Sequence, residues 1–384
     1  IPTQVQQKME NEEEYEEKKE KYFDLIHGNF PNWQKINHNN LENLALQRQQ
    51  DNNLKAFEPY ANGTLIAEWR ERGSTNQAGN VRVADYDKQS DSIYAISDGG
   101  ILWKGDLNGS DWHPLNDGFL LDKRVLEVLR LPSGNTRILA AKGHAVWYSD
   151  DQGQNWVKAS GFPSNSSYGS AMDLIRLEDN DSTIVYLYNQ LNGFGSGNNK
   201  LAYSTDHGAS FTEIYSFSTN DDRYTSMTAP YGASGAFVLD QNDATFWFEN
   251  GSLTPVASGL TFNGSDECQI EANMTSTDTT LYALMGSKYL HKSTDGGQSF
   301  SYIDTLPVNA WDCGISVSID DPNTLYYGAV ELYRTNVGGS NWSKVSEWWE
   351  YYSDVNNKIH ADIMSIRSFK KSNGTTFTLI PNHG

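Results

Sequence analysis

The sequence predicts an all-β fold, a seven-bladed β-propeller of four-stranded blades, preceded by an N-terminal helical segment. The first observation is composition, because 12% of the residues are aromatic and 32 Gly stand against 11 Pro. This mixture favours strands and tight turns over helices. The second is a set of short apolar runs that recur at spacings of 44 to 53 residues, the period that propeller blades require. Their aligned positions are Ile93, Ile138, Ile184, Phe237, Leu281, Leu325 and Phe377.

The chain divides into a charged N-terminal segment, residues 1–53, and a propeller, residues 54–384. Residues 4–26 are rich in Glu and Lys with a thin apolar stripe, which predicts a solvated helix, and a second short helix is expected around residues 41–48. Trp69 precedes Trp112 by 43 residues, in phase with the repeat. We therefore expect a strand near residues 64–73 to complete the last blade; the alternative is that the chain is part of a longer one.

Net charge limits the classes of partner. A formal charge of -20 repels nucleic acid and anionic membrane surfaces, and no apolar run approaches the roughly 20 residues that cross a bilayer. The chain begins at Ile1 rather than Met, from which we expect a removed leading segment and a secreted or cell-surface location. The expected partner is a protein or a polysaccharide.

A turn motif recurs in phase with the strands. Its pattern is Ser/Thr-x-Asp-x-Gly-x-x-Trp/Phe, and a fourth copy carries Val337 at the Asp position. A short carboxylate accepts backbone N–H groups of such a turn while the Gly takes a positive φ, so we expect a structural role. The three complete copies are Ser149, Asp151, Gly153 and Trp156; Ser204, Asp206, Gly208 and Phe211; and Ser293, Asp295, Gly297 and Phe300.

This motif resembles the Asp-box, or BNR repeat, of sialidases, sortilin-type receptors and secreted bacterial propellers. The resemblance covers about residues 64 to 384 and implies that the turn joins the third and fourth strands, on the face opposite the ligand. The chain lacks the Arg-Ile-Pro motif of sialidases, which argues against that activity.

The loops from the outer strand of one blade to the inner strand of the next would form the ligand face. Aromatic and acidic residues gather there, and they suit a carbohydrate or protein surface through ring stacking and oriented acceptors. Packing of Trp348 and Trp349 against the neighbouring blade or the N-terminal helix is the alternative. The predicted ligand-binding residues are Trp311, Trp348, Trp349, Tyr351, Tyr352 and Asp354.

Three carboxylates are candidates for catalysis, two on these loops and one at an inner strand. Asp266 and Asp312 occupy equivalent loops of successive blades, and such a pair hydrolyses a glycosidic bond when roughly 5 to 10 Å apart. Asp362 lies in "KIHADIMSIRSF", which resembles the His-x-Asp segment of secreted BNR propellers and xyloglucanase-like glycoside hydrolases. A buried hydrogen bond from His360 to Asp362, placed on one side of a strand, is the structural alternative.

Cys268 and Cys313 lie one period apart, each at the start of an inner strand. They form a disulfide or remain two buried thiols.

We predict a non-catalytic protein- or glycan-binding propeller, with a glycoside hydrolase and a passive module of a larger surface protein as alternatives. No cofactor or metal is expected, and structural calcium is not indicated.

Overall fold

The computed structural model describes residues 80–383, with breaks at 117–118, 163–168, 178–181, 191–196, 242–243, 259–261, 263–266, 312–313, 346 and 356. The predictions for residues 1–53 and for a strand near 64–73 lie outside the described residues, as do Asp266, Asp312 and Cys313.

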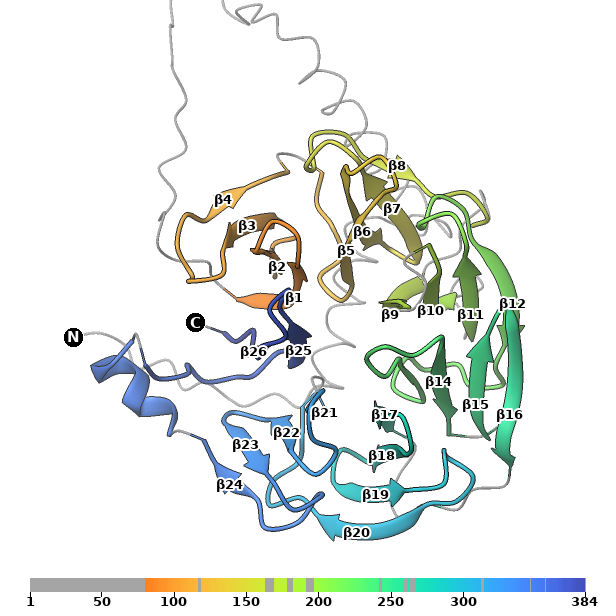
Figure 1. The fold of residues 1–384 in the computed structure, drawn as a ribbon, viewed down its shortest axis with the longest axis vertical. Helices are drawn as coiled ribbons and strands as arrows, with labels where there is room; N and C mark the ends of the chain where they lie inside the picture. The colour runs from red at the N-terminus through yellow and green to blue at the C-terminus, as the bar shows by residue number, and fades with distance from the viewer. Residues whose placement is uncertain are drawn as a thin grey trace, which may run out of the picture.

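Six antiparallel four-stranded sheets, the blades, are arranged in a ring (Figure 1). The first two blades are β1(Val81–Asp87), β2(Ser92–Ser97), β3(Leu102–Asp106) and β4(His113–Pro114); and β5(Leu126–Arg130), β6(Thr136–Lys142), β7(Ala145–Ser149) and β8(Val157–Lys158). The third and fourth are β9(Gly169–Arg176), β10(Ile184–Gln190), β11(Asn198–Ser204) and β12(Thr212–Ser216); and β13(Thr225–Thr228), β14(Gly235–Asp240), β15(Ala244–Glu249) and β16(Ser252–Ser258). The fifth and sixth are β17(Cys268–Met274), β18(Thr279–Met285), β19(Tyr289–Ser293) and β20(Ser301–Thr305); and β21(Ile315–Val317), β22(Leu325–Gly328), β23(Leu332–Thr335) and β24(Ser343–Lys344).

The prediction of seven four-stranded blades is wrong for the described residues. Between the sixth and first blades lies a two-stranded sheet, β25(Arg367–Lys370) and β26(Thr376–Leu379) (Figure 1). The seventh aligned run of the sequence is β26, and among the described residues it pairs only with β25. The apolar runs of the sequence mark only the second strand of each blade, so they do not show whether a third and a fourth strand follow.

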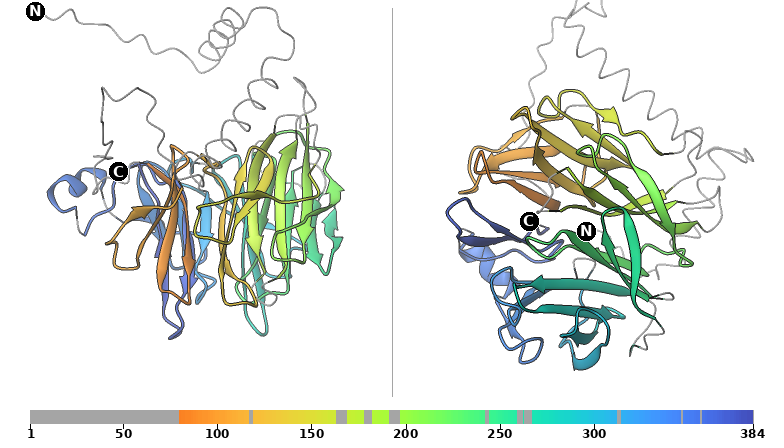
Figure 2. Two further views of the ribbon diagram at one scale, coloured as in Figure 1. Left: turned by 90° about the horizontal axis from the view of Figure 1, so that it is seen from above. Right: turned by 45° about the vertical axis from the view of Figure 1, so that its right-hand side comes forward.

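The second strand of each blade supplies most of the core. The strands β2, β6, β10, β14 and β18 are almost wholly buried, since side chains on both of their faces pack against neighbouring blades. The strands stand along the ring axis in the side view of Figure 2. The helix among the described residues is the short 3-10 helix η1(Trp348–Ser353).

The three Ser-x-Asp turns share one hydrogen-bond pattern. In the first, Ser149 Oγ donates to Asp151 Oδ1 at 2.8 Å and accepts the amide of Gly153 at 2.8 Å. Asp151 Oδ1 also accepts the amide of Asn155 at 2.8 Å. Gly153 has a φ of 82°, a conformation that glycine adopts without strain. Trp156 is buried against the blade, so the turn ties the third strand to the fourth.

Replacing Asp295 with Ala is expected to lower the free energy of unfolding by about 1–2 kcal/mol, because its carboxylate accepts two hydrogen bonds from Ser299. The Ser299 hydroxyl and amide lower the pKa of Asp295 to about 2. The contribution of the Asp295 carboxylate to stability is therefore fully present above the unfolded pKa near 4 and is lost as the pH falls toward about 2. Urea unfolding measures the change. The control Val337→Ala, at the turn that lacks the carboxylate, should change stability by less than about 0.5 kcal/mol.

The disulfide between Cys268 and Cys313 does not form in this structure, where Cys268 is a buried free thiol. Its Sγ lies 3.1 Å from the carbonyl oxygen of Tyr224 and 3.7 Å from that of Leu239. Both partners belong to the preceding blade, so the Cys268 side chain faces that blade. Burial raises the pKa of this thiol.

Candidate functional site

The loops from each outer strand to the next inner strand lie at one end of the ring, which we call the rim. The Ser-x-Asp turns lie at the opposite end, because they join third strands to fourth strands. Trp311 lies on the rim, and its amide donates to the carbonyl of Gly328 at 3.0 Å. Val330, two residues further on, accepts the amide of Asp362 at 2.8 Å. The loop between β22 and β23 therefore connects Trp311 to the segment after η1.

Helix η1 is held in place by charged residues at both of its ends. The Glu350 side chain accepts the amide of Glu347 at 3.1 Å, which closes a capping box. Lys344 lies 2.8 Å from Glu347, and Lys358 lies 3.0 Å from Glu350. The amide of Asp354 ends the helix by donating to the carbonyls of Glu350 and Tyr351. In the side view of Figure 2, η1 projects beyond the ring.

Four side chains of η1 and that of His360, which follows the helix, form an aromatic cluster that we call the rim cluster: Trp348, Trp349, Tyr351, Tyr352 and His360. Trp348 is perpendicular to Trp349 and to Tyr352, with centroid distances of 6.1 and 6.0 Å. Tyr351 meets His360 edge to face at 4.8 Å. Trp348, Trp349 and Tyr352 are 42%, 55% and 66% exposed, so each ring keeps a surface that faces solvent. Edge-to-face contacts order the rings in solvent.

The carboxylates of Glu350 and Asp354, beside the rim cluster, already have partners. Glu350 pairs with Lys358, and Asp354 Oδ1 accepts the side-chain amide of Asn357 at 2.9 Å. The lysine lowers the pKa of Glu350. These two groups therefore stabilise the cluster rather than present a free acid and base to a ligand.

The alternative of a His360–Asp362 hydrogen bond is wrong. Asp362 has a φ of 63° and precedes rather than lies in β25, so the two side chains do not share a strand face. Asp362 Oδ2 lies 3.3 Å from His383 Nδ1, whereas His360 contacts Tyr351 and Tyr352. Its carboxylate thus links the end of β26 to the rim.

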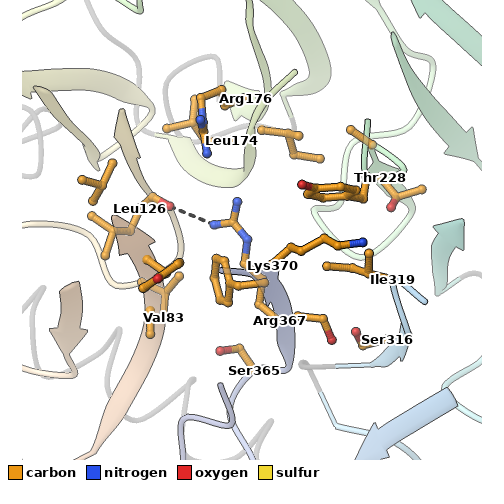
Figure 3. Close-up of a pocket in the computed structure, with 18 of the residues that line it drawn as sticks. Val83, Leu126, Leu174, Arg176, Thr228, Ser316, Ile319, Ser365, Arg367 and Lys370 are labelled. Carbon is orange, nitrogen blue, oxygen red and sulfur yellow. Dashed lines mark hydrogen bonds between the residues drawn. The ribbon is translucent and has the colours of Figure 1, made fainter. Parts of the chain in front are cut away.

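A second polar site lies in the central cavity, which has a volume of about 770 Å³. Arg367 on β25 points into it, as Figure 3 shows, and its Nη1 lies 3.3 Å from the Leu126 carbonyl oxygen and 3.3 Å from Asp85 Oδ1. Its Nη2 contacts Glu127 Oε1. Asp85 Oδ2 also accepts the amide of Val128 at 2.6 Å. One cation therefore joins the two-stranded sheet to the first and second blades.

Three carboxyls at or beside this cavity have raised pKa values. Burial raises the pKa of Glu127 to about 7, although Arg367 opposes the shift. Burial likewise raises the pKa of Asp173 to about 7, and burial together with the Asp173 carboxyl raises that of Glu271 to about 8. Burial acts to lower the pKa of the Arg367 guanidinium. The negative charges of Glu127 and Asp85 outweigh this effect and raise the pKa. Perturbed acids at a cavity wall can serve function or structure.

Sequence analysis missed this cavity site, although a signal was present. A charged residue stands on the inner strand of each of four blades, and another begins β25. These residues are Asp85, Glu127, Asp173, Glu271 and Arg367. Charges inside buried strands require partners, so their recurrence predicts a shared polar centre.

No group of three or more His, Cys, Asp or Glu suited to a metal ion occurs within the described residues. In the same part of the chain, no helix is both long and apolar enough to span a bilayer.

Comparison with known proteins gives the fold. No family model and no curated protein sequence matches the chain. Among solved structures, an ancestral GH74 enzyme aligns with a TM-score of 0.59 and 16% identity over 79% of this chain and 44% of its own. The GH74 xyloglucanase from Xanthomonas campestris aligns with a TM-score of 0.52 and 14% identity, over 79% of this chain and 51% of that one. YCF48 bound to D1 peptide aligns with a TM-score of 0.50 and 13% identity, over 80% and 91%.

The protein is therefore a β-propeller related in fold to GH74 and YCF48 propellers. At these identities the likeness concerns architecture. The chain spans about half the length, or less, of the GH74 enzymes that it matches.

Proposed function

We propose that the protein is a secreted or cell-surface binding module that holds a protein or glycan ligand on its rim cluster without catalysis. The observation that carries the proposal is the exposure of Trp348, Trp349 and Tyr352 on a helix fixed by ion pairs. Exposing ordered aromatic faces to water is unfavourable. Stacking on a sugar ring or burial in a protein partner lowers the free energy.

Two further observations support binding rather than hydrolysis. The carboxylates of Glu350 and Asp354, beside the rim cluster, are paired with Lys358 and Asn357. The YCF48 structure, which has the same fold over most of its length, is bound to D1 peptide. A binding propeller of this size is thus consistent with the architecture.

Glycoside hydrolysis is the second candidate, favoured by the likeness to the two GH74 enzymes. It requires an acid and a base or nucleophile roughly 5 to 10 Å apart. Asp266 and Asp312 remain the proposed pair for that reaction.

The double substitution Trp348→Ala and Trp349→Ala is expected to weaken ligand binding at least about tenfold, because it removes both stacking faces. The purified protein is screened on a glycan array and a peptide array, and the same polysaccharides are assayed for released reducing ends. Tyr302→Ala is the matched control, since Tyr302 is an exposed aromatic on the outer strand β20. That variant should bind as the unchanged protein does.

The outcomes separate the candidates. Binding without release, lost in the double variant, supports the binding module. Release of reducing ends that Asp312→Asn abolishes would replace the proposal with a hydrolase. Binding that survives the double variant would place the ligand site elsewhere.

A further inference from the structure

The exposed rings of the rim cluster meet at right angles. The Trp348 ring lies at 87° to the Trp349 ring, with a centroid distance of 6.1 Å. It lies at 88° to the Tyr352 ring, with a centroid distance of 6.0 Å. All three side chains are exposed to solvent. Trp348 is therefore shared by two right-angled corners, each of which is made by a pair of exposed aromatic rings.

A right-angled corner suits a compact ligand group better than a flat one. A sugar ring stacks on one flat aromatic face, whereas two perpendicular faces enclose a group that is nearly spherical. The face of an aromatic ring is electrically negative and attracts a cation within about 6 Å of the ring centroid. A cation that lies on the normal to both rings of the Trp348–Tyr352 corner would be about 4 Å from each centroid. Both rings would then contribute to its binding.

The carboxylates around η1 outnumber the lysines. Lys344 is shared by two carboxylates, because its Nζ lies 2.7 Å from Glu331 and 2.8 Å from Glu347. The Asp354 carboxylate accepts a neutral side-chain amide, so this contact leaves its negative charge in place. With the ion pair of Glu350, these contacts bring four carboxylates and two lysines together around the helix. The surplus of negative charge favours a cationic ligand.

The chemistry of the corner favours a fully methylated ammonium group. An unmodified ammonium has several N–H donors that lose water on entering the corner, and the ring faces offer them no oxygen acceptor. Methylation removes these donors and keeps the positive charge. A phosphate next to the ammonium group, as in phosphocholine, would be repelled by the carboxylates around η1. A methylated lysine side chain carries the charge on an apolar stem and brings no such anion.

We propose that the rim cluster recognises a trimethylated lysine side chain of a protein partner. The trimethylammonium group lies against Trp348, the ring that both corners share, and the carboxylates around η1 attract its charge. Because η1 projects beyond the ring (Figure 2), the partner reaches it without entering the central cavity. This inference rests on the proposed function, since it names the group that the rim cluster binds.

Proton NMR of a peptide ligand, with the full 384-residue chain, tests the proposal. The probe is the capped tripeptide Gly-trimethyllysine-Gly, and its matched control has carbon in place of the trimethylammonium nitrogen. We expect the N-methyl protons to shift upfield on binding, because protons above a ring face are shielded. The Kd should be at least about fivefold lower for the charged peptide than for the neutral one. Phosphocholine is titrated in the same way.

Three variants locate the binding site. Trp348→Leu removes the ring that both corners share but keeps an apolar side chain, so it should raise the Kd of the charged peptide at least about fivefold. Trp348→Phe restores an aromatic face and should recover most of the binding. Tyr302→Leu removes an exposed ring on the outer strand β20 and should leave the Kd unchanged. Urea unfolding shows whether each variant remains folded.

The outcomes separate this inference from the proposed function. Selective binding of the charged peptide that is lost in Trp348→Leu and retained in Trp348→Phe supports the inference. Equal binding of the neutral peptide would overturn it, because the corner would then recognise apolar volume. Tighter binding of phosphocholine than of the peptide would overturn it in favour of a choline-bearing ligand.

Failure of the peptide to bind overturns the inference in either of two ways. If an array ligand is still bound through Trp348 and Trp349, the rim cluster is a binding site for another chemical group and the proposed function stands. If no array ligand is bound either, the proposed function fails together with the inference.

Discussion

Replacing Arg367 with Met is expected to lower the free energy of unfolding by about 2–4 kcal/mol. The substitution keeps the length of the side chain but removes the cation that contacts Glu127 and Asp85, which are 0% and 1% exposed. Breaking a buried ion pair usually costs about 3–5 kcal/mol, and the lower range applies because the Arg367 side chain is 36% exposed. Urea unfolding near neutral pH, followed by tryptophan fluorescence, measures the loss.

Arg223→Met is the matched control for this prediction. Arg223 pairs with Asp221 and Glu267 on the rim, but its side chain is 57% exposed, so its removal should cost less than about 1 kcal/mol. The double variant Arg367→Met with Glu127→Gln should recover part of the loss, since it removes one charge left unpaired. Equal losses for Arg367→Met and Arg223→Met would contradict a central role for Arg367 in holding the ring together.

The fold was largely predictable because its signals are local and repeated. The apolar runs at Ile93, Ile138 and Ile184 became second strands, since a strand buried on both faces must be continuously apolar. The turns at Asp151, Asp206 and Asp295 depend on hydrogen bonds within a few residues, which a motif captures. The period therefore located the blades without tertiary information.

The number of complete blades was not predictable in the same way. A run such as that around Phe377 identifies a second strand but contains no information on its outer neighbours, and β26 has none among the described residues. The disulfide prediction failed for a related reason. One period of separation places Cys268 and Cys313 at equivalent positions, whereas the direction of the Cys268 side chain depends on packing against Tyr224 and Leu239.

The candidate sites differ in how far the sequence revealed them. The exposed rings of η1 followed from a loop that is rich in Trp and Tyr, because aromatic residues in a long surface loop lack a core to enter. The cavity network brings together residues as distant as Asp85 and Arg367. Only closure of the ring places these two residues side by side, so their contact could not be predicted from the spacing of residues along the sequence.

Glu271 gives the second large effect, a loss of stability with rising pH. Its pKa in the folded protein is about 8, against 4.5 for an unperturbed glutamic acid, so between these values the folded state binds more protons than the unfolded state. The free energy of unfolding then decreases as the pH rises, and the decrease ends above the folded pKa. Asp173 and Glu127, with pKa values of about 7, act in the same direction.

Glu271→Gln should remove much of this pH dependence. At about pH 4, where this carboxyl is mostly neutral in both the folded and the unfolded state, the two proteins should be similarly stable. At about pH 9 the variant should be more stable by about 1–3 kcal/mol, a range reduced for water in the cavity. The variant also lacks the charge that repels Asp173, so the remaining carboxyl ionises at lower cost. Urea unfolding at both pH values, with Glu213→Gln on the outer strand β12 as the control, measures the difference. An unchanged slope in Glu271→Gln would show that this carboxyl is ionised and solvated in the folded protein, whereas a flatter slope identifies the cavity as the part of the ring that limits stability in alkaline solution.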